Sequence, residues 1–339
     1  MTVREFKDEC KRRLSPLYQI GEISSLASRA LEDIYGISHT RQLTYPEEEI
    51  SPTGSFQKDS SSNISSADKP CVAVSLKSKC AAPEEVISRL ENGEPIQYIA
   101  GFEYFCGEKF KVGPGVLIPR PETEELVNLI AEETTSSWKE NQQARSSASP
   151  FKIFDVCTGN GCIAWSLHKL LSGHSSNKES EDCDSLCRSL ESYGCDISET
   201  ALKYAKNQRY LYGRRWPMFF RYDVLNGDFT ALKSFIGKLD IIVSNPPYIA
   251  EKEKALMHKN VLDFEPAEAL FVSDGDPLLF YRKIAGMAQE LLYPGGKLYF
   301  EINPLFAEEL KALLQQKNYR GICVTKDISG RNRFMSATR

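Results

Sequence analysis

From residue 151 to the C-terminus, segments with the character of buried strands alternate with segments whose apolar residues recur at helical spacing. Strands are expected at residues 151–156, 192–196, 218–223, 238–244, 296–302, 320–328 and 332–338. Helices are expected at residues 161–171, 199–212, 277–292 and 304–317. This alternation is typical of a doubly wound α/β domain with a mainly parallel sheet. Ligands bind such sheets at the carboxyl ends of the strands, so polar residues that follow a strand are the candidates for a site.

The first hundred residues have the pattern of a small helical domain. Apolar side chains recur at helical spacing over residues 2–18 and 22–35. Pro83 suits the first position of a further helix, which is expected to stop at Gly93. The expected parts of the chain are therefore a helical domain, a hairpin connector and an α/β domain, at residues 1–100, 101–124 and 125–339.

Three polar, serine-rich stretches interrupt these parts. Residues 51–69 contain seven serines. Such a composition cannot bury enough apolar surface to offset the entropy of ordering, so we expect disorder over residues 45–80. The stretches at 136–149 and 172–192 fall between expected elements and are interpreted as expansions of surface loops.

Composition excludes several classes of protein. The net charge of −4 and the pI of about 5.8 predict no general basic surface, so direct binding to nucleic acid is not expected. No apolar run approaches the roughly 18 residues of a membrane span, and the N-terminus lacks the apolar core of a secretion signal. The ten cysteines do not repeat the paired spacing of a structural zinc site. These features predict a cytoplasmic protein without a membrane segment or a metal centre.

The first expected strand of the α/β domain leads into a glycine-rich turn and then a helix, in the stretch FKIFDVCTGNGCIAWSL at residues 151–167. Asp155 ends the strand, and Gly159 and Gly161 allow the backbone of the turn to approach a ligand closely. The spacing D-x-C-T-G-x-G resembles the first motif of class I S-adenosylmethionine-dependent methyltransferases. That family usually has glycine where this chain has Cys157.

Acidic residues also follow the next two expected strands. Asp196 ends the strand in YGCDIS, where a carboxylate can accept hydrogen bonds from both ribose hydroxyls of a nucleoside. Asp223, in FFRYDVL, is placed to meet an adenine amino group. Either acid alone could simply cap a turn. Three acids at successive strand ends favour a nucleoside-containing cofactor.

The fourth expected strand ends in SNPPYI, residues 244–249. Asn-Pro-Pro-Tyr at this position resembles the catalytic motif of methyltransferases that modify a planar nitrogen, either an amide or an exocyclic base amine. Such a nitrogen is a poor nucleophile because its lone pair is delocalised. The side-chain oxygen of Asn245 and the carbonyl of Pro246 can each accept one N–H, which orients the nitrogen toward the methyl donor. Pro247 adds rigidity, and Tyr248 can pack on the planar group.

Four longer stretches resemble one family, the HemK-type release-factor glutamine methyltransferases. They are GEPIQYIAGFEYFCGEKFKVGPGVLIPRPETEELV (93–127), VLDFEPAEALFVSDGDPLLFYRKI (261–284), PGGKLYFEIN (294–303) and KDISGRNRFMSATR (326–339). The most specific string is PRPETE at residues 119–124. The resemblance implies a class I methyltransferase fold with a seven-stranded, mostly parallel sheet, preceded by the helical domain and the hairpin connector.

The resemblance also implies the reaction, the cofactor and the partner. Members of the family transfer a methyl group from S-adenosyl-L-methionine to the glutamine amide in the Gly-Gly-Gln motif of class-1 peptide-chain release factors, and their N-terminal domain helps to dock the release factor. The implied cofactor contacts are Asp155, Cys157, Thr158, Gly159, Asn160, Gly161, Asp196, Asp223, Val224 and Asn245. The implied catalytic and substrate-binding residues are Asn245, Pro246, Pro247 and Tyr248, joined on the substrate side by Arg120 and Glu122. Glu265 and Glu301 are inward candidates to which the sequence assigns no role.

Three alternatives stay open at this point. A sibling group of enzymes methylates a ribosomal-protein glutamine with the same Asn-Pro-Pro-Tyr site. A nucleic-acid amine methyltransferase would use the same chemistry but usually needs a basic face. A scaffold that binds the cofactor without catalysis is disfavoured by the complete tetrad at residues 245–248.

Overall fold

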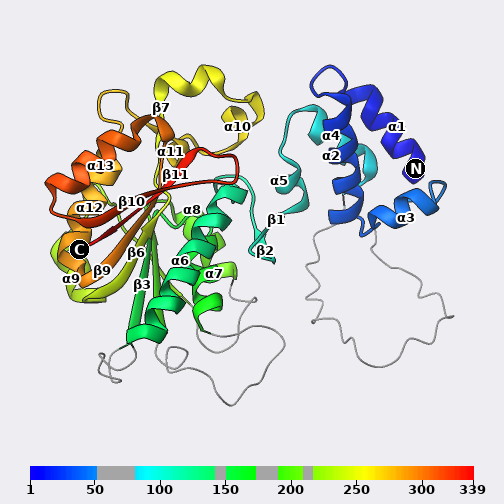
Figure 1. The fold of residues 1–339 in the computed structure, drawn as a ribbon. Coiled ribbons are helices and arrows are strands. Elements are labelled where there is room, and N and C mark those ends of the chain that lie inside the picture. Colours follow the sequence, from blue (N-terminus) through cyan, green and yellow to red (C-terminus); the bar gives the residue numbers. More distant parts are fainter. Residues whose placement is uncertain (52–80, 142–149, 173–189, 209–216) are drawn as a thin grey trace, which may run out of the picture. The chain divides into compact units, whose positions relative to one another are not determined.

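The computed structural model describes residues 1–51, 81–141, 150–172, 190–208 and 217–339 (Figure 1). Most of the three serine-rich stretches lies outside these ranges, as do the end of the helix expected at 199–212 and two of the ten cysteines, Cys183 and Cys187. Two expectations are wrong at the described edges of these stretches: residues 45–51, expected to be disordered, are ordered, with Ile50 buried and Glu49 bridged to Thr2, and residues 136–141, expected in a loop, belong to helix α6 (Pro121–Asn141). The chain divides into two compact units, Met1–Ala100 and Gly101–Arg339. The hairpin expected as a separate connector therefore falls within the second unit.

The first unit is helical and has its own apolar core. Its helices are α1 (Val3–Leu14), α2 (Ile20–Asp33), α3 (His39–Thr44), α4 (Pro83–Glu91) and α5 (Ile96–Ala100). A capping box between Thr2 and Glu5 starts α1. The helix stops at Leu14, earlier than the pattern over 2–18 predicted, because Pro16 has no N–H with which to continue the helical hydrogen bonds, although Ser15 itself keeps helical φ and ψ. Helices α3 and α5 are too short to leave a periodic signal in the sequence.

The second unit is built on a seven-stranded sheet with the order β10-β11-β9-β6-β3-β4-β5. The strands are β3 (Phe151–Val156), β4 (Leu190–Asp196), β5 (Met218–Arg221), β6 (Leu239–Ser244), β9 (Leu292–Glu301), β10 (Arg320–Lys326) and β11 (Asn332–Thr338). All neighbours pair in parallel except β11, which runs antiparallel to both β9 and β10. The predicted fold class, an α/β domain with a seven-stranded, mostly parallel sheet, is confirmed.

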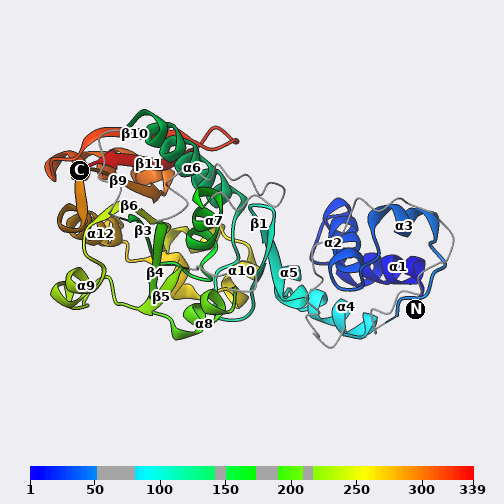
Figure 2. The same cartoon turned by 90° about the horizontal axis from the view of Figure 1, so that it is seen from below.

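Helices cover both faces of this sheet (Figures 1 and 2). They are α6 (Pro121–Asn141), α7 (Cys162–Leu171), α8 (Glu199–Asn207), α9 (Phe229–Ile236), α12 (Leu279–Leu291) and α13 (Ala307–Gln316). Helices α6, α7 and α8 share one core with the hairpin β1 (Phe102–Phe105) and β2 (Glu108–Lys111), and α9, α12 and α13 form the other. None of the helices in the described ranges is long and apolar enough to cross a membrane.

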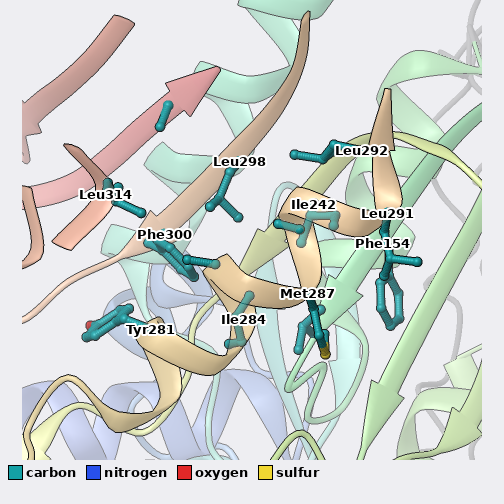
Figure 3. Packing of buried hydrophobic residues seen from close by; sticks show 14 of the residues in the cluster. Phe154, Ile242, Tyr281, Ile284, Met287, Leu291, Leu292, Leu298, Phe300 and Leu314 are labelled. Atoms are coloured by element: carbon teal, nitrogen blue, oxygen red, sulfur yellow. The ribbon is translucent and has the colours of Figure 1, made fainter. Parts of the chain in front are cut away.

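Strand residues alternate between the two cores, as the period of two in a strand requires. Ile153 packs on the side of α6 and α7, whereas Phe154 packs on the opposite side. Tyr299 and Phe300 divide in the same way. Figure 3 shows the second core, where Phe154 and Phe300 from the sheet lie in the same cluster as Tyr281 and Met287 of α12.

Short elements lie between β6 and α12, a region where no regular element was predicted. They are β7 (Ile249–Ala250), η3 (Glu251–Leu256), α10 (Lys259–Phe264), α11 (Ala267–Leu270) and β8 (Phe271–Val272). A turn of 3-10 helix, η4 (Pro304–Phe306), precedes α13, so that helix begins later than expected. Strand β7 directly follows the Asn-Pro-Pro-Tyr stretch and pairs in parallel with β8, so the two ends of this region lie side by side.

Candidate active site

The parallel strands β3, β4, β5 and β6 bring their carboxyl ends to one edge of the sheet. Val156 pairs with Cys195 on one side and with Ser244 on the other, so the turns after β3, β4 and β6 begin at the same level. The backbone N–H of Thr158 donates to the carbonyl of Cys195 at 2.9 Å and fixes the first turn against β4. The three turns named by the sequence are therefore neighbours.

The glycine-rich turn has left-handed backbone at three positions. The φ angles are 62° at Cys157, 56° at Gly159 and 83° at Gly161. A side chain at Gly161 is excluded by packing, because an added Cβ would lie 2.9 Å from Cζ of Phe219. The left-handed φ at Cys157 explains why glycine is usual at this position: a residue with a Cβ adopts that conformation at a cost.

Asp155 is fully buried under this turn instead of facing a cavity. One of its oxygens, Oδ2, accepts from the hydroxyl of Thr158 and from the N–H of Ala164 at 3.2 Å. The other oxygen has no hydrogen-bond partner among the described residues. Burial raises the pKa of the carboxyl to about 7, although both hydrogen bonds to Oδ2 act against this shift.

Asn160 likewise turns its side chain away from the edge of the sheet. Its amide donates to the carbonyl of Lys111 at 3.3 Å, and its oxygen accepts from the N–H of Cys162 at 3.2 Å. Gln208 donates to the same carbonyl at 2.9 Å and accepts from the N–H of Lys111 at 2.9 Å. Asn160 thus joins the glycine-rich turn to strand β2 of the hairpin.

Asp196 closes the turn from the side of β4. Its Oδ2 accepts from the N–H of Gly159 at 2.9 Å, and its Oδ1 accepts from the N–H of Ser198 at 2.9 Å. Burial raises the pKa of Asp196, and these backbone donors act against the shift. Each carboxylate oxygen can accept more than one hydrogen bond, so both oxygens keep capacity for a ligand hydroxyl.

Asp223 serves the turn after β5. Its Oδ1 accepts from the N–H groups of Leu225 and Asn226 at 2.9 and 3.2 Å, and its Oδ2 accepts from the side-chain amide of Asn226 at 3.2 Å. The strand ends at Arg221, two residues before the predicted end, so Asp223 belongs to the turn.

A cavity of about 220 Å³ opens at this edge of the sheet. The predicted site residues on its wall are Cys157, Gly159, Asp196, Asp223, Val224, Asn245 and Pro247. The other predicted site residues, which all lie in the described ranges, are absent from the wall: Arg120, Glu122, Asp155, Thr158, Asn160, Gly161, Pro246 and Tyr248. One cavity therefore reaches from the acid at the end of β4 to the amide at the end of β6.

The Asn-Pro-Pro-Tyr stretch is held by residues far away in the sequence. The amide nitrogen of Asn245 donates to Oγ1 of Thr123 at 3.3 Å. The phenol of Tyr248 donates to Oε1 of Glu301 at 3.0 Å, and the backbone oxygen of Tyr248 accepts from the side chain of Asn303 at 3.1 Å. Pro246 and Pro247 are buried, whereas Asn245 and Tyr248 are half-buried.

Arg120 forms an ion pair with the buried carboxylate of Glu265, with 2.6 Å between Nη2 and Oε1. The second oxygen of Glu265 accepts from the N–H of Ile118 at 3.1 Å. Glu265 therefore anchors the segment before α6 to the short elements after β7. Glu122 is half-buried in the first turn of α6.

Sequence reasoning missed several residues of the site. Thr123 directly follows the predicted Glu122 in PRPETE, and its hydroxyl contacts both Glu301 and Asn245. Glu265 and Glu301 were singled out only as inward acids, and their partners are 145 and 178 residues away. Cavity residues without any predicted role are Gly115, Val116, Leu117, Ile197, Ser198, Ala201, Tyr222, Leu225, Pro266, Glu268, Ala269 and Phe280.

The chemistry of the wall fits a nucleoside-containing cofactor. Tyr222, Val224 and Phe280 supply apolar surface for a flat base. Asp196 supplies a carboxylate whose oxygens can each accept a further hydrogen bond. At Gly159 an added Cβ would meet no atom within 4 Å, so the backbone of the turn borders open space. These residues are suited to hold S-adenosylmethionine, the cofactor predicted from the sequence.

Comparison with known proteins gives a consistent set of relatives. The chain is 46% identical over 257 residues to the release factor glutamine methyltransferase of Bacteroides thetaiotaomicron, which covers 76% of this chain and 80% of the relative. It is 40% identical over 252 residues to the protein of the same name from Flavobacterium psychrophilum, covering 74% and 78%. A solved release factor-specific protein-(glutamine-N5) methyltransferase from Alicyclobacillus acidocaldarius aligns with 68% of this chain and 99% of that chain, at 24% identity and a TM-score of 0.35. No protein-family model matches the chain.

Proposed function

The chain belongs to the release factor glutamine methyltransferase family, and we propose that it methylates the glutamine amide in the Gly-Gly-Gln motif of class-1 peptide-chain release factors. The observation that carries the proposal is the shared cavity of Asp196 and Asn245. The carboxylate suits a ribose, and the amide suits a planar nitrogen.

The cofactor end of the cavity is assigned to residues of three turns. S-adenosylmethionine supplies an electrophilic methyl group on a sulfonium. Asp196 accepts the ribose hydroxyls, with its orientation set by the N–H groups of Gly159 and Ser198. Val224 lies on the cavity wall beside the expected place of the base. Asp155 and Asn160 act indirectly, because both side chains support the turn from behind.

The substrate end is assigned to Asn245 and its neighbours. Asn245 Oδ1 accepts one N–H of the substrate amide, and the carbonyl of Pro246 accepts the other. Transfer to this nitrogen would break the bond between the methyl carbon and the sulfonium, leave the donor as a neutral thioether, and release one of the two nitrogen protons to solvent. The contribution of the protein is orientation, which can lower the barrier by several kcal/mol. Tyr248 lies off the cavity wall, where Glu301 holds its phenol, and is assigned to support of the turn that carries Asn245.

The first unit, Met1–Ala100, is assigned to docking of the release factor. Every residue of the candidate site belongs to the second unit. The first unit has a closed apolar core of its own and leaves Leu17, Ile20, Leu43 and Tyr45 exposed. A docking role accounts for a folded unit that adds no residue to the cavity.

The test is methyl transfer from radiolabelled S-adenosylmethionine to purified release factor, with ribosomes and nucleic acid in parallel. We expect label in release factor alone, and mass spectrometry should place one methyl group on the peptide that contains Gly-Gly-Gln. A release factor whose Gly-Gly-Gln is changed to Gly-Gly-Glu is the control and should stay unlabelled. Label in ribosomal protein or nucleic acid, and none in release factor, would contradict the proposal.

A further inference from the structure

The carboxylate of Glu301 is buried at the end of β9 and serves two hydroxyl groups. Thr123 donates to Oε2 at 2.7 Å, and Tyr248 donates to Oε1 at 3.0 Å. The backbone at Glu301 is fixed as well, because its carbonyl accepts from the phenol of Tyr281 at 3.0 Å and its Cα partner on β11 is Phe334. Strand β11 and helix α12 therefore fix the backbone that carries this carboxylate.

Proton counting then determines how Asn245 is oriented. The hydroxyl of Thr123 has a single proton, which it gives to Glu301. Toward Asn245 the same oxygen can only accept, so the atom of Asn245 that faces Thr123 must be the amide nitrogen, at 3.3 Å. The side-chain oxygen of Asn245 is left for the other side, and Asn245 lines the cavity.

We propose that Glu301 is a positioning residue which, through the hydroxyl of Thr123, sets the amide of Asn245 so that its oxygen faces the substrate. This inference rests on the proposed function. An Asn side chain is nearly symmetric in shape, and a rotation by half a turn would present N–H donors where the substrate nitrogen needs an acceptor. Such a rotation would also turn Oδ1 of Asn245 toward the hydroxyl oxygen of Thr123 and leave two acceptors facing each other, so the hydrogen bond that Thr123 donates to Glu301 disfavours it. Burial raises the pKa of Glu301, whereas the hydrogen bonds from Thr123 and Tyr248 and the charge of Arg333 favour its ionised form.

The test compares isosteric variants in single-turnover methyl transfer to release factor, with cofactor affinity measured by calorimetry. Thr123→Val removes the hydroxyl, and we expect a fall in rate on the order of 10- to 100-fold. Thr123→Ser keeps the hydroxyl and should stay within about threefold of wild type. Glu301→Gln places an N–H opposite one of the two hydroxyls, which must then accept this N–H instead of donating to a carboxylate. We expect the rate to fall roughly tenfold. Cofactor affinity should change by less than about threefold in all of them.

A matched control and a double variant separate positioning from support of the fold. Glu133→Gln alters a similar bond between α6 and β9, where Glu133 accepts from Tyr299 at 2.7 Å, and it should leave the rate unchanged. The double variant Thr123→Val with Glu301→Gln should lose far less than the product of the two single losses, because the part of the Glu301 effect that passes through Thr123 is already absent and only the part through Tyr248 remains.

Several results would overturn the inference. One is a Thr123→Ser rate as low as the Thr123→Val rate, and another is a rate within twofold of wild type for both Thr123→Val and Glu301→Gln. The others are rate losses that multiply in the double variant, and a rate loss in Glu133→Gln equal to that in Glu301→Gln. In each case an active wild type shows that the proposed function stands. A wild-type chain that transfers no methyl group to release factor would overturn the proposed function, and this inference with it.

Discussion

The backbone N–H of Gly159 donates to Oδ2 of Asp196 at 2.9 Å, and this bond joins the turn after β3 to the end of β4. Gly159 lies in the left-handed region, with φ of 56°, which directs its N–H toward the acid. The bond holds Asp196 at the cavity wall while leaving lone pairs on both oxygens for a ligand. The same acid therefore organises the turn and is available to the cofactor.

Asp196→Ala should weaken binding of S-adenosylmethionine by tenfold or more. Hydrogen bonds to a charged group contribute about 1.5–3 kcal/mol each, and the variant loses those to the ribose. Calorimetry measures the change, and circular dichroism verifies that the fold persists. Glu199→Gln, on the surface of α8 nearby, is a control that should bind normally. An unchanged affinity in a folded Asp196→Ala chain would remove this residue from the site.

Asn245 variants should separate catalysis from cofactor binding. Asn245→Ala removes the acceptor for the substrate N–H, and Asn245→Gln moves it by about one methylene. A misplacement of about 1 Å can cost on the order of 100-fold in rate. Asn245→Asp places a charge near the sulfonium and loses the N–H donor to Thr123. All three should lower single-turnover methyl transfer far more than cofactor affinity, and near wild-type transfer by Asn245→Ala would show that SNPPYI is only a strand end.

Cys157→Gly should be tolerated, whereas Cys157→Val should not. The left-handed φ of 62° costs a residue with a Cβ about 1–2 kcal/mol, which glycine avoids. Glycine also loses the packing of the thiol, so we expect unfolding free energies within about 1 kcal/mol of wild type and retained cofactor binding. Valine is branched at Cβ and strains this backbone further. Urea unfolding and calorimetry test both variants, and a Val variant equal to Gly would contradict this account of the turn.

Stability should depend on pH through Asp155. Its pKa is raised to about 7 in the folded chain, above the ordinary value of 3.8, so the folded state binds the proton more tightly than the unfolded state. The resulting stabilisation is complete below the unfolded pKa and is lost as pH rises through about 7. Relative to Asp155→Asn, wild type without cofactor should lose about 1–3 kcal/mol of unfolding free energy between pH 5 and pH 8. Urea titrations at both pH values measure this difference, and parallel curves for the two chains would show that Asp155 titrates normally.

Removal of the first unit should affect the protein substrate more than the chemistry. A chain that begins at Gly101 keeps both apolar cores around the sheet and the whole cavity wall. It should bind S-adenosylmethionine as wild type does and methylate intact release factor at least tenfold less efficiently, mainly through KM. A short peptide that contains Gly-Gly-Gln should be methylated equally slowly by both chains. Full efficiency of the shorter chain on intact release factor would exclude a docking role.

Much of this architecture follows from local patterns along the chain. The strand β3, its glycine turn and helix α7 were predicted within a residue, because a buried apolar run, two glycines and a helical period all act over a few positions. The carboxyl ends of parallel strands lie at the same edge of a sheet. The sequence motifs at the ends of β4 and β6 were therefore enough to predict that Asp196 and Asn245 lie close together. Helix ends were less certain where a 3-10 turn intervened, as it does before α13.

Side-chain direction and long-range pairing depend on packing between segments that no local pattern relates. Asp155 and Asn160 were predicted to meet the cofactor, but the path of the turn points one into the core and the other toward Lys111. Glu301 meets Thr123 because the register of β9 and the position of α6 place their side chains together. The motifs thus indicate which residues carry the chemistry. The assembled sheet and helices establish which of them reach the cavity and which hold the others in place.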